Sequence, residues 1–599
     1  MGQSNGMASD DMQADDTAAP EKLAGDVSAS GAAPVRTPPL GGASADGVSA
    51  PPWGALWVLA LGLAMIVLDG SIVNVSIPAI IADIKISLTD AQWVTSLYSI
   101  VLAALLLPLG KLGDAKGRKT VFQTGVAVFV VSSLLAAGSR NAAMMLSART
   151  LQGIGAAMIM PATLSTMSAS FRGKYRAAAF GVWGAVMSAA AAIGPLLGGW
   201  FTQTIGWRWI FIVNLPVGVV VFLAAIPLVP QTGGPRPDAG ATMPGSVERR
   251  IGADPWGMLL SAVSSGLLIF SLIEGETYGW WRQSSAFSLG SWTWNRTWPV
   301  SPIPLCLVVA VVCFALFVVL ERARARRGRP VMLDLSLFSI RTFAWGNLAA
   351  GAISAGEFAI IFVLPLYLIN ARGMDTMQAG GILAAMAAGA IVSGGLARHV
   401  SRLLTAAGTV QLGLVCEIAG VAATVALMGD GYSAVSLLVA LAVYGFGLGL
   451  ASAQLTSVVL SQVPVAQSGE GSATQSTIRQ LGTAMGAAIS GTSLAITLNA
   501  VLPARLSAIS GLPSRVASGL ATAVSSTAGN IIPTIRAQGT TGKLGPLGPH
   551  VADAMTSGFV EGGRWAMAIA GSMLIIGLLA SIMVRRANDR AIEGGRADR

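Results

Sequence analysis

Five ionisable side chains of this sequence stand inside long apolar runs: Asp69, Arg149, Glu357, Glu417 and Arg479. Because burial disfavours the charged form of a carboxyl group, a buried carboxyl can take up a proton and release it when water reaches it. The chemistry that these residues offer is therefore reversible proton binding. Asp69 is the first candidate, because it stands in the middle of the first run and Arg149 stands in the middle of another run of the N-terminal region.

The same residues have a purely structural interpretation, in which an ion pair only locks two helices together. Each unpaired charge costs about 3 kcal/mol at the centre of a bilayer, so all five are expected to be paired or in contact with water. We favour a functional role for Asp69 and Arg149. For Glu357 both interpretations remain open, and for Glu417 and Arg479 the structural one is favoured.

The sequence lacks the motif of a nucleotide-driven pump, in which a Gly-Lys pair is followed by Ser or Thr. Its Gly-Lys pairs are followed instead by Leu112, Tyr175 and Leu544. With two histidines and three cysteines, it offers no metal site and no pairing of a nucleophile with a base. We therefore expect no metal, no cofactor and no enzymatic activity, and any uphill transport must use an ion gradient.

The composition is that of a membrane protein. Of 599 residues, 53% are apolar and 11% are charged, whereas a soluble domain carries about 25% charged residues. The mean hydropathy is +0.67. The apolar runs are continuous over about 20 residues, as in transmembrane helices, and do not alternate as in a barrel. A soluble enzyme is excluded, and the net charge of +10 is attributed to membrane topology and not to nucleic-acid binding.

The apolar runs predict an all-α polytopic membrane protein with fourteen transmembrane helices. The runs lie near residues 55–80, 92–112, 119–138, 141–170, 176–200, 207–229, 256–274, 302–320, 342–370, 378–397, 403–428, 433–462, 472–499 and 564–584. Two six-helix halves are expected, with helices 7 and 8 inserted between them. The predicted domains are a disordered tail (1–52), the N-terminal half (53–230), the inserted helices with their loops (231–330), the C-terminal half (331–585) with a long external loop (500–562), and a second tail (586–599).

The distribution of Lys and Arg sets the expected orientation, because cytoplasmic loops of membrane proteins are enriched in both residues. If both termini lie on one side, that side holds 25 of the 38 Lys and Arg residues and the opposite side holds 10. We therefore expect a multi-pass protein of the cell membrane with both termini, and hence both tails, in the cytoplasm.

Five motifs follow one another in the N-terminal region. They are Leu68–Pro78, Gly110–Lys119, Arg149–Gly155, Gly184–Gly199, and Trp207–Phe211 with Asn214 and Pro216. In this order they resemble the signatures of the major facilitator superfamily, and in particular of its 14-helix drug:proton antiporter branch, the multidrug efflux type. The C-terminal half matches that branch more loosely, through Arg479–Gly482.

The resemblance implies the major facilitator fold, in which two six-helix halves rock around a central cavity during proton-coupled export. It assigns proton coupling to Asp69 and Arg149, and we add Glu357 on burial alone. The implied cytoplasmic gate consists of Gly110, Asp114, Gly117, Arg118 and Lys119. The implied helix 5 motif, which limits leak, consists of Gly184, Gly194, Pro195, Gly198 and Gly199. The candidates for a substrate cavity are Asn74, Gln152, Glu357, Glu417 and Arg479.

The sequence thus predicts a proton-coupled antiporter that exports small amphipathic compounds or drugs. Its expected partners are a small-molecule substrate, protons and the lipid bilayer, without nucleic acid, and we expect a monomer. Two alternatives stay open. One is a dedicated exporter of a single metabolite, antibiotic, siderophore or lipid precursor, and the other is a membrane receptor or scaffold that transports nothing.

Overall fold

The computed structural model of this chain describes most of the predicted bundle. The described residues are 52–171, 179, 186, 190, 193–232, 254–289, 292–294, 298–329, 331–429, 433–464 and 468–597. The predicted tail 1–52 lies outside them except for its last residue, and so does most of the predicted span 176–200.

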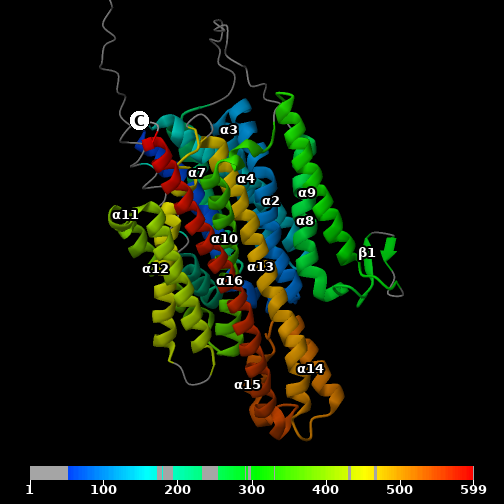
Figure 1. Cartoon of the computed structure of the whole chain (residues 1–599). Helices are drawn as coiled ribbons and strands as arrows, with labels where there is room; N and C mark the ends of the chain where they lie inside the picture. Colours follow the sequence, from blue (N-terminus) through cyan, green and yellow to red (C-terminus); the bar gives the residue numbers. More distant parts are fainter. Residues whose placement is uncertain are drawn as a thin grey trace, which may run out of the picture. The chain divides into compact units, whose positions relative to one another are not determined.

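The described part of the N-terminal half is built from helices, the first four of which follow one another through short turns (Figure 1). They are α1 (Trp53–Ile84), α2 (Leu88–Lys116), α3 (Arg118–Ala137), α4 (Ala142–Ser170), α6 (Trp209–Ile212) and α7 (Asn214–Leu228). Residues 193–204 are also helical. A capping box starts α2, because Ser87 Oγ accepts the Asp90 N–H at 3.0 Å and the Asp90 carboxylate accepts the Ser87 N–H at 2.9 Å.

The predicted inserted helices are α8 (Pro255–Tyr278) and α9 (Pro302–Arg326). Asp254 joins their ends, since its carboxylate accepts the Gly257 N–H at 2.9 Å and pairs with Arg324 of α9 at 3.3 Å. A short antiparallel hairpin lies between them in the sequence, with β1 (Phe287–Leu289) paired to β2 (Trp292–Trp294). Helix α8 packs against α2 of the N-terminal half and against α13 (Ser468–Ser507), so it contacts both halves.

The other elements of the C-terminal half are η1 (Leu335–Ser339), α10 (Arg341–Leu366), the π-turn η2 (Tyr367–Ala371), α11 (Thr376–Leu427), α12 (Ala434–Val459) and α16 (Gly548–Ala597). Helix α11 begins with a capping box of Asp375 and Gln378. It is broken at Thr405, whose φ of 68° and ψ of 165° are not helical. The predicted span 378–397 therefore lies before this break, and the span 403–428 lies after it except for its first residues.

Ten helices among the described residues are long and apolar enough to cross a membrane. One of the ten is α11, which contains two predicted spans, while α2 and α4, with 29 residues each, match predicted spans without being among the ten. The all-α polytopic fold is confirmed, and a total of fourteen spans is consistent with these helices.

The predicted loop 500–562 is largely helical, which its Ala/Ser/Gly/Pro-rich composition did not indicate. It contains the end of α13, α14 (Ser514–Ser526), α15 (Ile532–Gln538), the 3₁₀ turns η4 (Gly539–Thr541) and η5 (Gly545–Leu547), and the start of α16. Helix α14 packs on α13 and buries Ala517, Ala521 and Val524, which recur at helical spacing. These helices lie at the end of the bundle away from the C-terminus, here called the α15 end (Figure 1). At the opposite end, α16 continues through most of the predicted tail 586–599.

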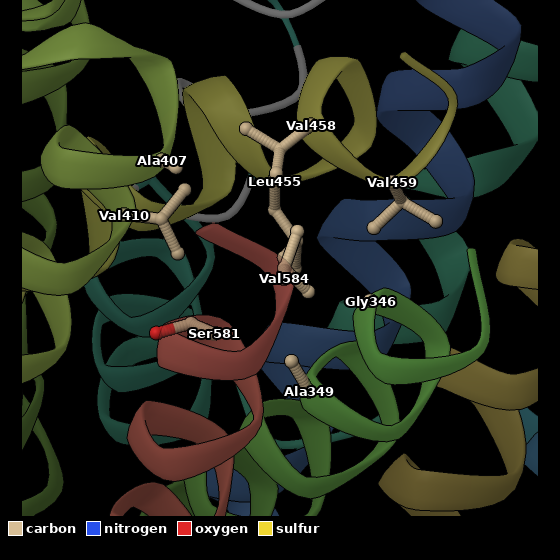
Figure 2. A pocket seen from close by; sticks show the side chains of 9 residues that line it. All are labelled: Gly346, Ala349, Ala407, Val410, Leu455, Val458, Val459, Ser581 and Val584. Carbon is tan, nitrogen blue, oxygen red and sulfur yellow. The ribbon is translucent and has the colours of Figure 1, made fainter. Parts of the chain in front are cut away.

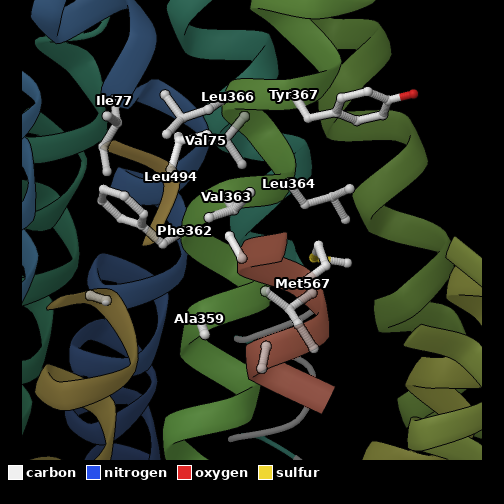
Figure 3. Close-up of a cluster of buried hydrophobic side chains, with 14 of the residues drawn as sticks. Val75, Ile77, Ala359, Phe362, Val363, Leu364, Leu366, Tyr367, Leu494 and Met567 are labelled. Carbon is white, nitrogen blue, oxygen red and sulfur yellow. The ribbon is translucent and has the colours of Figure 1, made fainter. Parts of the chain in front are cut away.

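Two large clusters of buried apolar side chains form most of the core. One lies within the N-terminal half and includes the first part of α1, whereas the other joins the two halves. In the second cluster, Val75 and Ile77 of α1 pack with Phe362 and Leu366 of α10 and with Leu494 of α13 (Figure 3). The second part of α1 is therefore the place where the two halves share one apolar core.

The close contact between α3 and α4 at Gly155 leads to a prediction about stability. A Cβ atom on Gly155 of α4 would lie 2.8 Å from the Phe129 nitrogen and 2.9 Å from the Gly125 oxygen of α3, whereas a Cβ on Gly381 of α11 would meet nothing within 4 Å. We expect Gly155→Val to lower the free energy of unfolding by about 1–3 kcal/mol through overpacking. Thermal unfolding in detergent measures this, with Gly381→Val as the matched control, and equal losses in both variants would contradict it.

Candidate functional site

A buried ion pair lies inside the N-terminal half. Arg149 of α4 donates from Nη1 to Oδ2 of Asp69 on α1 at 2.6 Å, and the two side chains are 1% and 0% exposed. A buried pair of this kind is held only where the remaining polar atoms are also bonded, because both charges have lost their water. The structure therefore brings together the first two residues that the sequence singled out.

Two amides complete the surroundings of the Asp69 carboxylate. Gln152 Nε2 and Asn214 Nδ2 donate to Asp69 Oδ1 at 3.0 and 3.2 Å, and Gln152 Oε1 accepts from Arg149 Nη1 at 2.9 Å. Both amides also donate to Ser133 Oγ, at 2.9 and 3.2 Å. Both carboxylate oxygens of Asp69 thus accept hydrogen bonds from neighbouring side chains.

Helix α2 holds the far side of Arg149. The Arg149 Nε–H donates to the Val94 carbonyl at 3.0 Å, and the guanidinium lies over the Tyr98 ring, 4.3 Å from its centroid. A cation over an aromatic face is attracted by the ring quadrupole. With Ser133 on α3 and Asn214 on α7, side chains or carbonyls of five helices meet in this cluster.

Sequence reasoning assigned no role to Asn214 or Ser133. Asn214 belongs to a quoted motif, which was a usable signal, whereas Ser133 is one serine among many and offered none. Gln152, expected in the substrate cavity, is fully buried in the ion-pair cluster. Asn74 is also buried but donates to the Gly70 carbonyl of its own helix at 2.6 Å, so it does not join the cluster.

The other predicted ionisable residues lie in the C-terminal half. Glu357 on α10 and Glu417 on α11 are 4% and 0% exposed. Arg479 on α13 donates from Nε to Ser354 Oγ at 3.4 Å. Electrostatic interactions join Arg479 to Glu357 and Glu357 to Glu417. The five cavity candidates are thus divided between the halves, two in the N-terminal and three in the C-terminal half.

Two pockets in the described residues do not coincide with these candidates. One is small and lies within the C-terminal half, between α10, α11, α12 and α16, and Ser581 supplies the one side-chain oxygen in its lining (Figure 2). The other lies between α8, α13 and α16 and is lined mainly by apolar side chains with Thr492, Ser493 and Thr497. Neither contains a predicted site residue.

The predicted gate residues make contacts within the N-terminal half. Arg118 Nη1 donates to the Ser165 carbonyl of α4 at 3.0 Å, and Lys119 Nζ donates to the Ile226 carbonyl of α7 at 2.5 Å. Gly117 separates α2 from α3 with a φ of 105°, which a residue with a side chain rarely adopts. A Cβ on Gly110 would lie 3.2 Å from Pro161. The side chain of Asp114 lies outside the described ones.

The described glycines of the helix 5 motif face two helices of different halves. A Cβ on Gly198 would lie 2.8 Å from the Ile72 oxygen of α1, and Gly194 faces Ser71 on the same helix. A Cβ on Gly199 would lie 2.6 Å from the Thr376 oxygen of α11. On α11, a Cβ on Gly380 would lie 2.6 Å from the Pro195 oxygen. The motif thus packs between α1, near Asp69, and α11. Gly184 lies outside the described residues.

Comparison with known families and solved structures shows what this chain is similar to. The sequence model of the Major Facilitator Superfamily matches residues 59–294 and 284–487. The fold is similar to that of a bacterial homolog of the human lysosomal transporter Spinster, solved in an inward-facing and unoccupied conformation. That likeness has a TM-score of 0.58 and 16% identity, covers 90% of this chain and 99% of that one, and concerns the fold alone.

Two relatives are informative. This chain is 32% identical to the multidrug resistance protein Stp of Mycobacterium tuberculosis, over 74% of this chain and 76% of that protein. It is 28% identical to the tetracenomycin C resistance and export protein of Streptomyces glaucescens, over 92% of this chain and 95% of that protein. The matches therefore extend over most of both chains.

From the burial of the Asp69–Arg149 pair we predict how much Arg149 contributes to stability. Arg149→Met leaves a buried carboxylate without its counter-charge, and we expect a loss of about 3–5 kcal/mol in the free energy of unfolding. Arg208→Met is the matched control, because Arg208 and Asp83 pair at the same 2.6 Å with side chains 42% and 47% exposed. An exposed pair contributes about 0–1 kcal/mol. Similar losses in chemical denaturation of both variants would contradict the role given to burial.

Proposed function

This chain belongs to the Major Facilitator Superfamily, and we propose that it is a proton-coupled exporter of small amphipathic compounds in the cell membrane. The observation that carries the proposal is the buried Asp69–Arg149 pair, which places a titratable group among five helices of one half. The cargo is moved without chemical change. The family match and relatives with resistance and export in their names support export as the activity.

Proton coupling follows from what protonation does to the ion pair. In the observed arrangement the Asp69 carboxyl group accepts hydrogen bonds from Arg149, Gln152 and Asn214. A proton on Asp69 removes its attraction for Arg149 and turns one of its acceptor oxygens into a donor. The contact between α1 and α4 then loses the Asp69–Arg149 ion pair. We propose that this loosening links proton uptake to the rocking of the halves, with Glu357 as the corresponding acid of the other half.

The proton gradient supplies enough free energy for this task. One proton moving down 100 mV releases about 2.3 kcal/mol. A pH difference of one unit adds about 1.4 kcal/mol. Together they support roughly a 500-fold gradient of a neutral cargo for each proton exchanged.

The distribution of positive charge supports an orientation with both termini in the cytoplasm. The side with the termini holds 25 of the 38 Lys and Arg residues, including the five arginines of 321–329. The α15 end then faces outward. In this orientation the contact of Gly199 with α11 and the shared core around Val75 close the outward path, and the Gly110–Lys119 segment lies at the cytoplasmic gate. Both halves belong to one chain, so we propose that the monomer transports.

A dedicated exporter of a single compound is the second candidate function. It is favoured by the match to the tetracenomycin C resistance and export protein, which covers 92% of this chain, whereas the match to the multidrug resistance protein Stp favours broad export. A resistance screen with a panel of antibiotics and lipophilic cations in a pump-deficient host separates the two. Protection against several unrelated compounds supports broad export.

The proposed coupling predicts the effect of neutralising Asp69. In everted membrane vesicles, the unmodified chain should take up a lipophilic cation when a proton gradient is imposed, and an uncoupler should abolish the uptake. Asp69→Asn keeps the size of the side chain but cannot exchange a proton, so uphill uptake should be lost. Asp83→Asn, which alters a half-exposed carboxylate of the same helix, is the control and should retain uptake. Full uphill uptake in Asp69→Asn would remove Asp69 from the coupling mechanism.

A separate prediction concerns the contact of Gly199, in the helix 5 motif, with α11. Gly199→Leu places a side chain where the Thr376 backbone of α11 now lies, so the outward path cannot close. We expect this variant to lose most uphill transport and to dissipate an imposed pH gradient faster than the unmodified chain. Gly381→Leu on α11 points into open space and is the matched control. An unchanged rate of pH dissipation in Gly199→Leu would contradict the sealing role.

A further inference from the structure

A second carboxyl group is buried in the C-terminal half under very different conditions. Glu417 of α11 is 0% exposed, and neither of its carboxylate oxygens has a hydrogen-bond partner among the residues that the structure describes. Asp69, by contrast, is equally buried but has both oxygens bonded. The proposed coupling through Asp69 makes no use of Glu417.

Helix α12 packs tightly against this position. A Cβ on Gly447 would lie 2.6 Å from the Glu417 nitrogen and 2.9 Å from its Cγ, and a Cβ on Gly420 would lie 2.6–2.7 Å from the backbone and Cβ of Tyr444. The Tyr444 hydroxyl is buried, interacts electrostatically with Glu417 and has no hydrogen-bond partner in the described part of the chain. A polar O–H group therefore lies near the carboxyl group without a fixed bond.

The remaining ionisable groups around Glu417 come from two other helices. Glu357 of α10 is 4% exposed and interacts electrostatically with Glu417, and its Oε1 has no hydrogen-bond partner within the described ranges. Arg479 of α13 interacts electrostatically with Glu357. On α11 itself, the neighbouring ionisable group is the Cys416 thiol. Helix α16 contacts α11 through Gly571, which lies against Val421. The stretch 567–578 of α16 contains no ionisable residue.

These surroundings decide the protonation state. A carboxylate buried without hydrogen bonds or a counter-charge is strongly disfavoured, and such a group binds a proton instead. Two carboxyl groups close to one another cannot both be charged without repulsion. Arg479 gives Glu357 a nearby positive charge, whereas no guanidinium or ammonium group among the described residues pairs with Glu417. Glu417 is thus the acid of the two that holds the proton.

We propose that Glu417 is a second proton-binding site of this exporter, located in the C-terminal half and assisted by Glu357 and Tyr444. The proposal rests on the proposed function and deepens it. On release, the O–H bond of the Glu417 carboxylic acid breaks, the proton passes to water, and the carboxylate that remains can accept the Tyr444 hydroxyl. The two acids then differ, because Asp69 is bonded through both oxygens whereas Glu417 holds a proton, and one cycle can exchange more than one proton.

A structural role for Glu417 would require a different arrangement. An acid that only joins helices does so through hydrogen bonds or an ion pair, as Asp69 does with α4 and α7. Among the described residues, neither oxygen of Glu417 makes such a bond. The buried carboxyl group of Glu417 therefore does not join two helices. An acid that binds and releases a proton, by contrast, must not be held in a permanent ion pair.

Infrared spectroscopy of the purified full chain in lipid nanodiscs tests the proposal with protons as the sole probe. A protonated carboxyl group has a C=O stretching band that a carboxylate lacks, and an alkaline shift of the medium removes the band as the proton leaves. We expect Glu417→Gln to lose one such band at neutral pH. Asp69→Asn should keep it, because the proposal assigns this band to Glu417.

Two further variants keep the test decisive. Glu417→Asp retains an acid at this position and should keep a band with a changed frequency, even if Glu417→Gln folds poorly. An unaltered set of bands in both Glu417 variants would overturn the proposal. The result is independent of the vesicle assay for Asp69: loss of coupled uptake in Asp69→Asn tests the proposed function, and loss of the band in Glu417→Gln tests the second site.

Discussion

Burial of charge is the constraint on which the rest of this structure depends. The bundle encloses the Asp69 carboxylate and the Arg149 guanidinium completely, and each would be strongly destabilising alone. Donors from α4 and α7 therefore surround the carboxylate, and a carbonyl and a ring from α2 surround the guanidinium. The positions of these helices in the N-terminal half are tied to a single titratable group, so a proton on that group acts on all of them at once.

Close packing carries such a change from one half to the other. The helix 5 glycines pack on α1 beside Asp69 and also on the start of α11. The second part of α1 shares an apolar core with α10 and α13 (Figure 3). A shift of α1 relative to α4 therefore cannot stay local, because glycine contacts without side chains leave no free space to absorb it. The charged cluster and the joint between the halves lie on the same helix.

Much of this arrangement was predictable from the sequence. Apolar runs of membrane-spanning length gave the all-α fold, and Asp69 and Arg149 were conspicuous because charges are rare in such runs. Ser133 and Asn214 were assigned no role, since a serine or an asparagine in a membrane helix is not rare and only the fold shows what it contacts. The helices of 500–562 were missed because a composition rich in Ala, Ser and Gly was interpreted as a loop, although Ala517, Ala521 and Val524 recur at helical spacing. For Glu417, the sequence showed burial but not the absence of bonded partners, and the structural interpretation was favoured for that reason.

The central claim is that the Asp69 carboxyl exchanges a proton against cargo. The most direct measurement is the pH of a weakly buffered solution of the purified chain when a lipophilic cation such as tetraphenylphosphonium is added, with binding followed in parallel. The account predicts that binding acidifies the solution and that the Asp69→Asn variant acidifies it less for the same amount of bound cation. Binding without acidification, or equal acidification by both proteins, would contradict it.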